Sequence, residues 1–158
     1  MRRSRATLRK PEEKDLPLVI DVSREFHEAS WFSYTQFSYS RIADLFFACV
    51  ETGPDKFGEV AVNEADQCVG FFTGGAQEHY WSNTRMAVDL AFYIQPEYRT
   101  FRLAKDMIES FENWAQHIAG CQSIMLGVTA GLQPEKTARL YAKLGYGDRY
   151  YGLRKSFT

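Results

Sequence analysis

The segment YIQPEYRTFRLAKDMI, residues 93–108, decides the fold class, because it joins an apolar strand to an amphipathic helix through a turn without glycine. The helical part belongs to one apolar stripe formed by Leu103, Ala104, Met107, Ile108, Phe111, Trp114, Ala115 and Ile118. Gly120 follows the stripe and is typical of a helix end. The segment therefore predicts a crossover from a strand into a long surface helix.

The same periodicity arguments predict the other elements. We expect strands at residues 6–9, 57–64, 68–76, 86–94 and 123–130, and one or two more within DRYYGLRKSF, residues 148–157. We expect helices from Pro11 to Phe26, over residues 40–50, and from Pro134 to Gly145. The run at 123–130 is continuously apolar, which predicts a strand buried on both faces and parallel to its neighbour.

This order predicts one α+β domain, residues 1–158, with a mixed, mostly antiparallel central sheet flanked by helices on both faces. A chain of 158 residues, 45% of them hydrophobic, has enough apolar side chains for one packed core. Its net charge of -1 excludes the overall basic field that is typical of nucleic-acid-binding proteins. The basic residues Arg2, Arg3, Arg5, Arg9 and Lys10 cluster at the start, as a solvated tail or, alternatively, an arm that binds nucleic acid.

Cysteine and histidine spacing argues against a metal centre. Cys49, Cys68 and Cys121 form no CxxC pair, and no histidine has a second ligand at helical spacing. We therefore expect no disulfide framework, no bound metal and a cytoplasmic location. No segment has the apolar length of a signal peptide or a membrane span, so no membrane partner is expected.

Two segments, together with the element order, resemble the GCN5-related N-acetyltransferase (GNAT) family over nearly the whole chain. LAFYIQPEYRTFRLAKDMI, residues 90–108, resembles the coenzyme-binding segment, whose turn has the pattern Arg/Gln-x-x-Gly-x-Gly/Ala. ARLYAKLGYGDRYYGLRK, residues 138–155, resembles the C-terminal segment, in which a helical Tyr precedes a Leu-Gly-Phe/Tyr turn. The resemblance implies transfer of an acetyl group from acetyl-CoA, a co-substrate, to a primary amine.

The turn departs from the family pattern. Arg99 and Ala104 fit it, but Arg102 stands at the first glycine position and Thr100 where many members have glycine. A helix N-terminus keeps unpaired N–H groups whatever its side chains, so the turn still predicts an anion site. The resemblance assigns acetyl-CoA binding to Phe92, Tyr93, Ile94, Arg99, Thr100, Phe101, Arg102, Leu103, Ala104 and Lys105. The alternative is a solvated helix face that binds nothing.

The resemblance also implies catalytic roles. Tyr141 is expected to be the general acid near the sulfur, and the alternative is a tyrosine that only packs in the core. Asp89 is the first candidate for the general base, and a strand carboxylate between Val88 and Leu90 is either desolvated, with a raised pKa, or paired with an arginine. Glu78 and His79 are further candidates, and a water relay is an alternative to any single base.

The acceptor is expected to lie under Trp31, Phe32 and Tyr34 and beside Glu78 and His79. These aromatic residues favour a flat or apolar-bodied amine, either a small molecule or part of a macromolecule, unless they only form core. A nucleic-acid-modifying relative of the same fold is a second hypothesis, and a non-catalytic binding protein is a third. An exposed final strand favours pairing across a homodimer.

Overall fold

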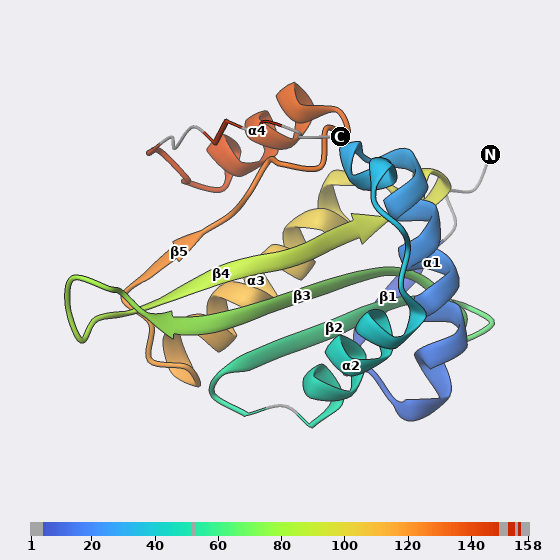
Figure 1. Cartoon of the computed structure of the whole chain (residues 1–158), viewed down its shortest axis with the longest axis horizontal. Coiled ribbons are helices and arrows are strands. Elements are labelled where there is room, and N and C mark those ends of the chain that lie inside the picture. The colour runs from blue at the N-terminus through green and yellow to red at the C-terminus, as the bar shows by residue number, and fades with distance from the viewer. Residues whose placement is uncertain (1–4, 52, 149–151, 154, 156–158) are drawn as a thin grey trace.

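A computed structural model describes residues 5–51, 53–148, 152–153 and 155 (Figure 1). Its strands are β1 (Ala6–Arg9), β2 (Lys56–Asn63), β3 (Cys68–Glu78), β4 (Arg85–Ile94) and β5 (Ser123–Met125). Its α-helices are α1 (Leu16–Ala29), α2 (Tyr39–Val50), α3 (Phe101–His117) and α4 (Pro134–Lys143). Short 3-10 helices are η1 (Glu13–Asp15), η2 (Trp31–Tyr34) and η3 (Pro96–Tyr98). Most of the predicted final strand at 148–157, and Arg2 and Arg3 of the basic start, lie outside the described residues.

The five described strands form one sheet in the order β1-β2-β3-β4-β5. The first four are antiparallel to their neighbours, and β5 is parallel to β4. Helix α3 covers one face, and α1 and α2 cover the other (Figure 1). The predicted α+β fold, with its mixed and mostly antiparallel sheet between helices, is therefore confirmed. Among the described residues, none of the helices combines the length and the apolar character that a membrane span requires.

Alternation along the strands divides the apolar side chains between two cores. On the α3 side, Phe72, Met107, Ile108 and Phe111 are fully buried in one cluster. A second cluster on the other side includes Val19, Val22, Phe46, Val60 and Phe71. The ring of Phe111 lies so close to Gly74 that a Cβ at that position would collide with it. Helix α3 therefore sits directly on β3, and its position relative to the sheet is fixed.

Strand β4 contains a β-bulge. Thr73 pairs with Ala91 and Gly74 pairs with Asp89, so that Leu90 is an extra residue without a partner on β3. On its other edge, β4 pairs with β5 only from Met86 to Val88. Beyond this point the two chains separate, and the sheet opens.

The prediction of a strand over residues 123–130 is therefore wrong for its second half. Only Ser123–Met125 pairs with β4, and Ser123 and Met125 are exposed rather than buried on both faces. The physical reason lies in β4, where the bulge interrupts the regular edge. The Asp89 carboxylate then accepts a hydrogen bond of 2.7 Å from the Gly127 N–H, which takes the place of a strand-to-strand bond.

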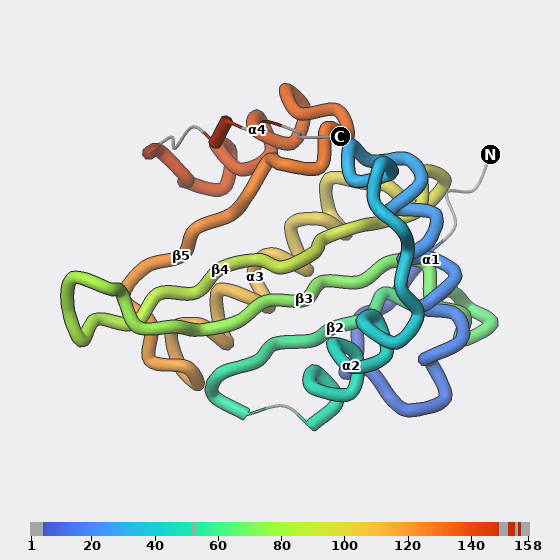
Figure 2. The backbone as a smooth tube through the Cα atoms, in the orientation of Figure 1, coloured from blue at the N-terminus to red at the C-terminus, as the bar shows by residue number. Residues whose placement is uncertain are grey.

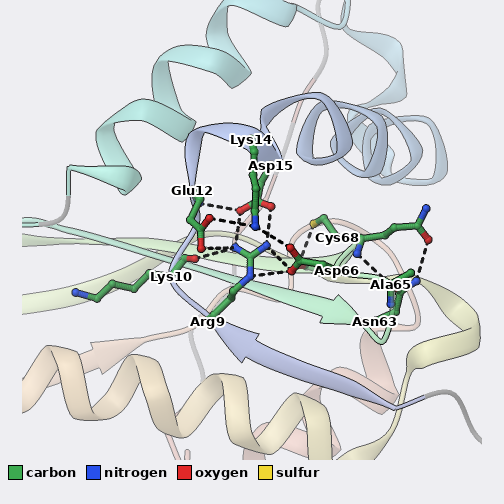
Figure 3. A network of polar contacts seen from close by, with 11 residues as sticks. Arg9, Lys10, Glu12, Lys14, Asp15, Asn63, Ala65, Asp66 and Cys68 are labelled. Atoms are coloured by element: carbon green, nitrogen blue, oxygen red, sulfur yellow. Dashed lines mark hydrogen bonds and ion pairs between the residues drawn. The ribbon is translucent and has the colours of Figure 1, made fainter.

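A polar network anchors the start of the chain (Figure 3). The Arg9 guanidinium donates to both carboxylate oxygens of Asp15, at 2.7 and 2.8 Å, and also to Asp66 in the turn between β2 and β3. Asp15 is 2% exposed and also accepts the Glu12 N–H at 2.8 Å. Lys14 pairs with Asp66 at the exposed rim. These bonds join β1, the entry to α1 and the β2–β3 turn.

Candidate active site

A cavity of about 480 Å³ lies where β4 separates from the chain that follows β5. Its walls are the second half of β4, the start of α3, the loop before α4 and α4 itself, with side chains from α1 and η2. It is lined by Phe26, Phe32, residues 89–94, residues 99–101, Ala104, residues 127–133, Lys136, Thr137, Leu140 and Tyr141. Segments that are far apart in the sequence therefore meet around one space.

The start of α3 borders this cavity through Thr100, Phe101 and Ala104. The Thr100 hydroxyl accepts the Leu103 N–H at 3.1 Å and so caps the helix. The Thr100 carbonyl accepts the Ala104 N–H at 3.1 Å. The N–H groups of Phe101 and Arg102 lie in the first turn, where a helix provides no internal partner for them. Two amides and the positive end of the helix dipole are thus available to an anion without any glycine.

The three cations predicted to bind phosphate lie in different environments. Arg99 lines the cavity, and its Nε donates to the Ile94 carbonyl at 2.7 Å while its guanidinium lies 5.2 Å from the centre of the Tyr93 ring. The Arg102 side chain is 92% exposed and faces Asp106 of its own helix at 3.8 Å. Lys105 pairs with Glu109 at 2.8 Å. Of the three, only Arg99 lines the cavity.

The two predicted catalytic residues line the same cavity. Burial raises the pKa of Asp89, although the hydrogen bond from the Gly127 N–H opposes this shift. Tyr141 is 6% exposed, and burial together with the nearby Asp89 carboxylate raises the pKa of its hydroxyl. At neutral pH Tyr141 is therefore protonated, so that a proton donor and a carboxylate face one space.

Most of the residues that were predicted to bind acetyl-CoA line the cavity. Phe92, Tyr93 and Ile94 on β4, and Thr100, Phe101 and Ala104 on α3, all contribute to its lining. Leu103 does not, because its side chain is buried in the core between α3 and the sheet. Beyond Val88, β5 no longer pairs with the outer edge of β4, so that the β4 backbone there faces the opening.

The aromatic segment at 31–34 is docked onto one wall. The Trp31 N–H donates to the Ala130 carbonyl at 2.9 Å, and its indole covers Gly131 so closely that a Cβ there would collide. Gly131 has a φ of +73°, a conformation that favours glycine. Phe32 lines the cavity, whereas Trp31 and Tyr34 do not.

The structure does not bring Glu78 and His79 to the cavity. They lie at the far end of β3, where Glu78 pairs with Arg85 and the chain turns back into β4. Figure 2 shows this turn on the left of the molecule, at the opposite end of β4 from the start of α3. Their placement therefore gives no support to the predicted roles as base or acceptor contacts.

Several lining residues were not predicted from the sequence. The Leu90 side chain was not predicted to line the site, because nothing in MAVDLAFYI marks a bulge. Residues 127–133 were predicted mainly as strand, although Gly127 and Gly131 within that run are a signal for irregular backbone. Lys136 lies one turn into α4 and brings a second cation to the cavity. Among the described residues, no group of three ligating side chains is placed to hold a metal ion.

The fold is shared with known acetyltransferases. A crystal structure of an acetyltransferase from Trypanosoma brucei has a TM-score of 0.73 and 20% identity, over 97% of this chain and 100% of the other. Glucosamine-6-phosphate N-acetyltransferase from Arabidopsis thaliana has a TM-score of 0.66 and 16% identity, over 98% and 99%. An aminoglycoside acetyltransferase from an uncultured soil metagenomic sample has a TM-score of 0.69 and 18% identity, over 97% and 95%.

A comparison with curated protein sequences gives no match. The sequence pattern of the family described as "Acetyltransferase (GNAT) family" matches residues 19–146, which include both strands that separate, the start of α3 and Tyr141. This match covers most of the chain and agrees with the observed fold. The chain therefore belongs to the GNAT family of acetyltransferases.

Proposed function

We infer that the chain is an N-acetyltransferase that transfers the acetyl group of acetyl-CoA to a primary amine in the cavity between β4 and the loop before α4. The observation that carries this proposal is the joint presence of Asp89, Tyr141 and the start of α3 around one opening in the sheet. Family membership implies acetyl-CoA as the co-substrate, which supplies the activated acyl group. The chain supplies an anion site, a carboxylate and a hydroxyl.

The anion site fits the phosphates of the co-substrate although the turn has lost its glycines. In the family, glycine allows close approach of the backbone. Here the Arg102 side chain is 92% exposed, so its Cβ does not close the site, and the amides of Phe101 and Arg102 are available. The Arg99 guanidinium uses its Nε for the Ile94 carbonyl, which fixes its position and leaves its terminal amino groups for phosphate oxygens.

The carboxylate and the hydroxyl suit the two proton transfers of acyl transfer to an amine. Asp89 takes a proton from the ammonium group, because only the neutral amine is nucleophilic, and its raised pKa makes it a better base. The neutral amine forms the C–N bond at the thioester carbon, the C–S bond breaks, and Tyr141 donates its proton to the departing sulfur. The second proton that the nitrogen loses restores the Tyr141 hydroxyl, and Asp89 releases its proton to solvent. Each positioned proton transfer contributes roughly 10²- to 10⁴-fold to a rate.

Thermal unfolding with and without acetyl-CoA tests the proposal, using wild type, Arg99→Ala and Arg102→Ala. A ligand at about a hundred times its Kd stabilises the native state by roughly 2.7 kcal/mol, which raises the midpoint visibly. We expect a rise in wild type and in Arg102→Ala, and a smaller rise in Arg99→Ala at the same concentration. No rise in any of the three proteins would contradict acetyl-CoA binding and favour a non-catalytic binding protein.

A further inference from the structure

The cavity has two walls, because its lining includes side chains from both faces of the sheet. Phe92, Ile94 and Tyr141 belong to the core on the α3 side. Phe26, Tyr93 and Leu132 belong to the core on the side of α1 and α2. Both sets of side chains line the same space. The opening in the sheet therefore connects two compartments.

The proposed function indicates which ligand occupies each compartment. If phosphates bind at the start of α3, the co-substrate occupies the compartment on the α3 side. The amine must then reach the acyl group from the opposite side, past Phe26 and Phe32. This step rests on the proposed function, and it turns the α1-side wall into the surface that the acceptor contacts.

That wall is apolar and aromatic. The bulge presents Leu90 beside Asp89, and the Leu90 side chain is 49% exposed although it lines the cavity. Phe32 is 37% exposed at the same cavity. An apolar ligand that covers partly exposed apolar side chains in a cavity binds favourably, because it removes apolar surface from water.

The charges around the cavity oppose a polycation. Asp89 is the one carboxylate among its lining residues in the described part of the chain, and it is accompanied by the cations Arg99 and Lys136. Glu25, on α1 beside this wall, is already engaged, because it accepts the Tyr93 hydroxyl at 2.7 Å and the Gln95 amide at 2.8 Å. An acceptor with several ammonium groups would therefore find one carboxylate and two like charges.

We propose that the acceptor is a primary amine with a single ammonium group on a flat, apolar body, and that Phe32 and Leu90 select this body. The ammonium group reaches Asp89 through the opening in the sheet, and the body packs against Phe32 and Leu90. Such an amine is presented either by a free arylalkylamine or by the N-terminus of a peptide whose first residue is aromatic. The two sources share this chemistry and are separated by experiment.

The test compares kcat/KM for acetyl transfer from acetyl-CoA to phenethylamine, ethanolamine, spermidine and a short peptide that begins with Phe. We expect phenethylamine or the peptide to exceed both ethanolamine and spermidine at least tenfold, since apolar burial discriminates by roughly 10- to 200-fold. A higher value for the peptide identifies the source as a peptide N-terminus, and a higher value for phenethylamine identifies a free amine. Preference for spermidine or ethanolamine would overturn the proposal.

Variants test whether the side chains of this wall determine the preference for an apolar amine. Phe32→Ala and Leu90→Ala should each raise KM for the preferred apolar amine at least fivefold and should lower kcat/KM for that amine more than for ethanolamine. Phe47→Ala, which removes an exposed aromatic side chain of α2 outside the cavity, is the matched control and should change neither value. Equal losses for both amines in Phe32→Ala and Leu90→Ala would overturn selection by these residues.

The same proteins separate failure of this proposal from failure of the proposed function. If acetyl-CoA raises the unfolding midpoint but only polar or polycationic amines react, or none reacts, the acceptor assignment is wrong while acetyl-CoA binding stands. If acetyl-CoA gives no rise, both fail together.

Discussion

The hydroxyl of Tyr93 donates a hydrogen bond of 2.7 Å to the carboxylate of Glu25, which joins the cavity-lining part of β4 to α1. Gln95 donates to the second carboxylate oxygen at 2.8 Å, so both oxygens of Glu25 are engaged. Burial and the neighbouring Glu25 raise the pKa of Tyr93 to about 12, against the lowering effect of Arg99. Tyr93 is therefore a hydrogen-bond donor over the whole physiological pH range.

Glu25→Gln should leave the KM for the amine within threefold, because the carboxylate serves α1 and β4 rather than the ammonium group. A Gln side chain loses the charge-assisted character of the bonds and should lower the free energy of unfolding by about 1 kcal/mol. Steady-state kinetics and urea unfolding measure the two effects. A tenfold rise in KM would instead assign Glu25 to ammonium binding and contradict its structural role.

Asp89→Asn should lower kcat/KM about a hundredfold or more, in the range of a lost general base. The Asn Oδ1 still accepts the Gly127 N–H, so the unfolding midpoint should change little. In wild type the rate should fall as the pH falls, because protonated Asp89 is no base, and the raised pKa places this loss above the ordinary aspartate range. The pH profile of kcat/KM should lose this acid limb in Asp89→Asn, and a limb that persists would assign the base elsewhere.

Tyr141→Phe should lower kcat about a hundredfold while the fold is kept, since the ring remains in the core and only the proton donor is lost. Tyr146→Phe is the matched control, because it removes the hydroxyl that donates to Glu112 at 2.8 Å, outside the cavity lining. It should cost about 1 kcal/mol of stability and no activity. Equal kinetic losses in both variants would show that Tyr141 acts through packing.

Asp15→Ala should lower the free energy of unfolding by about 3 kcal/mol, since it leaves the Arg9 guanidinium and the Glu12 N–H without their shared partner. Lys14→Ala, which removes an ion pair at the 56% exposed Lys14 side chain, should have a much smaller effect. Burial alone would raise the pKa of Asp15, but Arg9 and the Glu12 N–H lower it overall. The stabilisation of the fold by ionised Asp15 is therefore fully present above the ordinary aspartate pKa, and it is lost as the pH falls through the lowered pKa of Asp15. Urea unfolding at pH 7 and acid unfolding measure both.

Glu59→Gln should stabilise the protein at pH 8 and not at pH 4. Burial raises the pKa of Glu59 from 4.5 to about 7, with Asp106 adding to the shift and the hydrogen bond from Ser110 opposing it. The native state thus binds the proton more tightly than the unfolded state, so wild type loses stability as the pH rises from 4.5 to about 7. Urea midpoints at several pH values test this, with Glu64→Gln on the exposed β2–β3 turn as control. A Gln variant whose advantage does not grow with pH would disprove the coupling.

Much of the fold follows from local patterns. The stripe from Leu103 to Ile118 predicts α3 because seven of its side chains pack on the sheet, and α3 runs from Phe101 to His117. The strands predicted at 57–64, 68–76 and 86–94 are found at Lys56–Asn63, Cys68–Glu78 and Arg85–Ile94. In each strand the side chains alternate between two cores, and this alternation can be recognised in a single sequence.

The site is less predictable because its shape depends on a pairing defect. The extra residue at Leu90 cannot be recognised in MAVDLAFYI, because that segment is apolar on both faces apart from Asp89. The run at 123–130 is continuously apolar and therefore reads as one strand. Tyr141 was predicted from family resemblance and Asp89 from its place on the strand before the turn, and the structure places both in the cavity. Glu78 and His79 were grouped with the acceptor by their chemistry, but the length of β3 carries them to the far end of the sheet.

The bulge at Leu90 also decides which face of the sheet carries the Asp89 side chain. In a regular strand, Asp89 would share a face with Ala91 and Tyr93, which pack toward α1. The extra residue places Asp89 opposite Gly74, on the face of Ala87 and Phe92, where Tyr141 also lies. If the strand paired regularly with Leu90 retained in the ladder, the carboxylate would turn away from the tyrosine, although both catalytic side chains would still be present. The unpaired state of one residue on β4 therefore decides whether the acid and the base face each other.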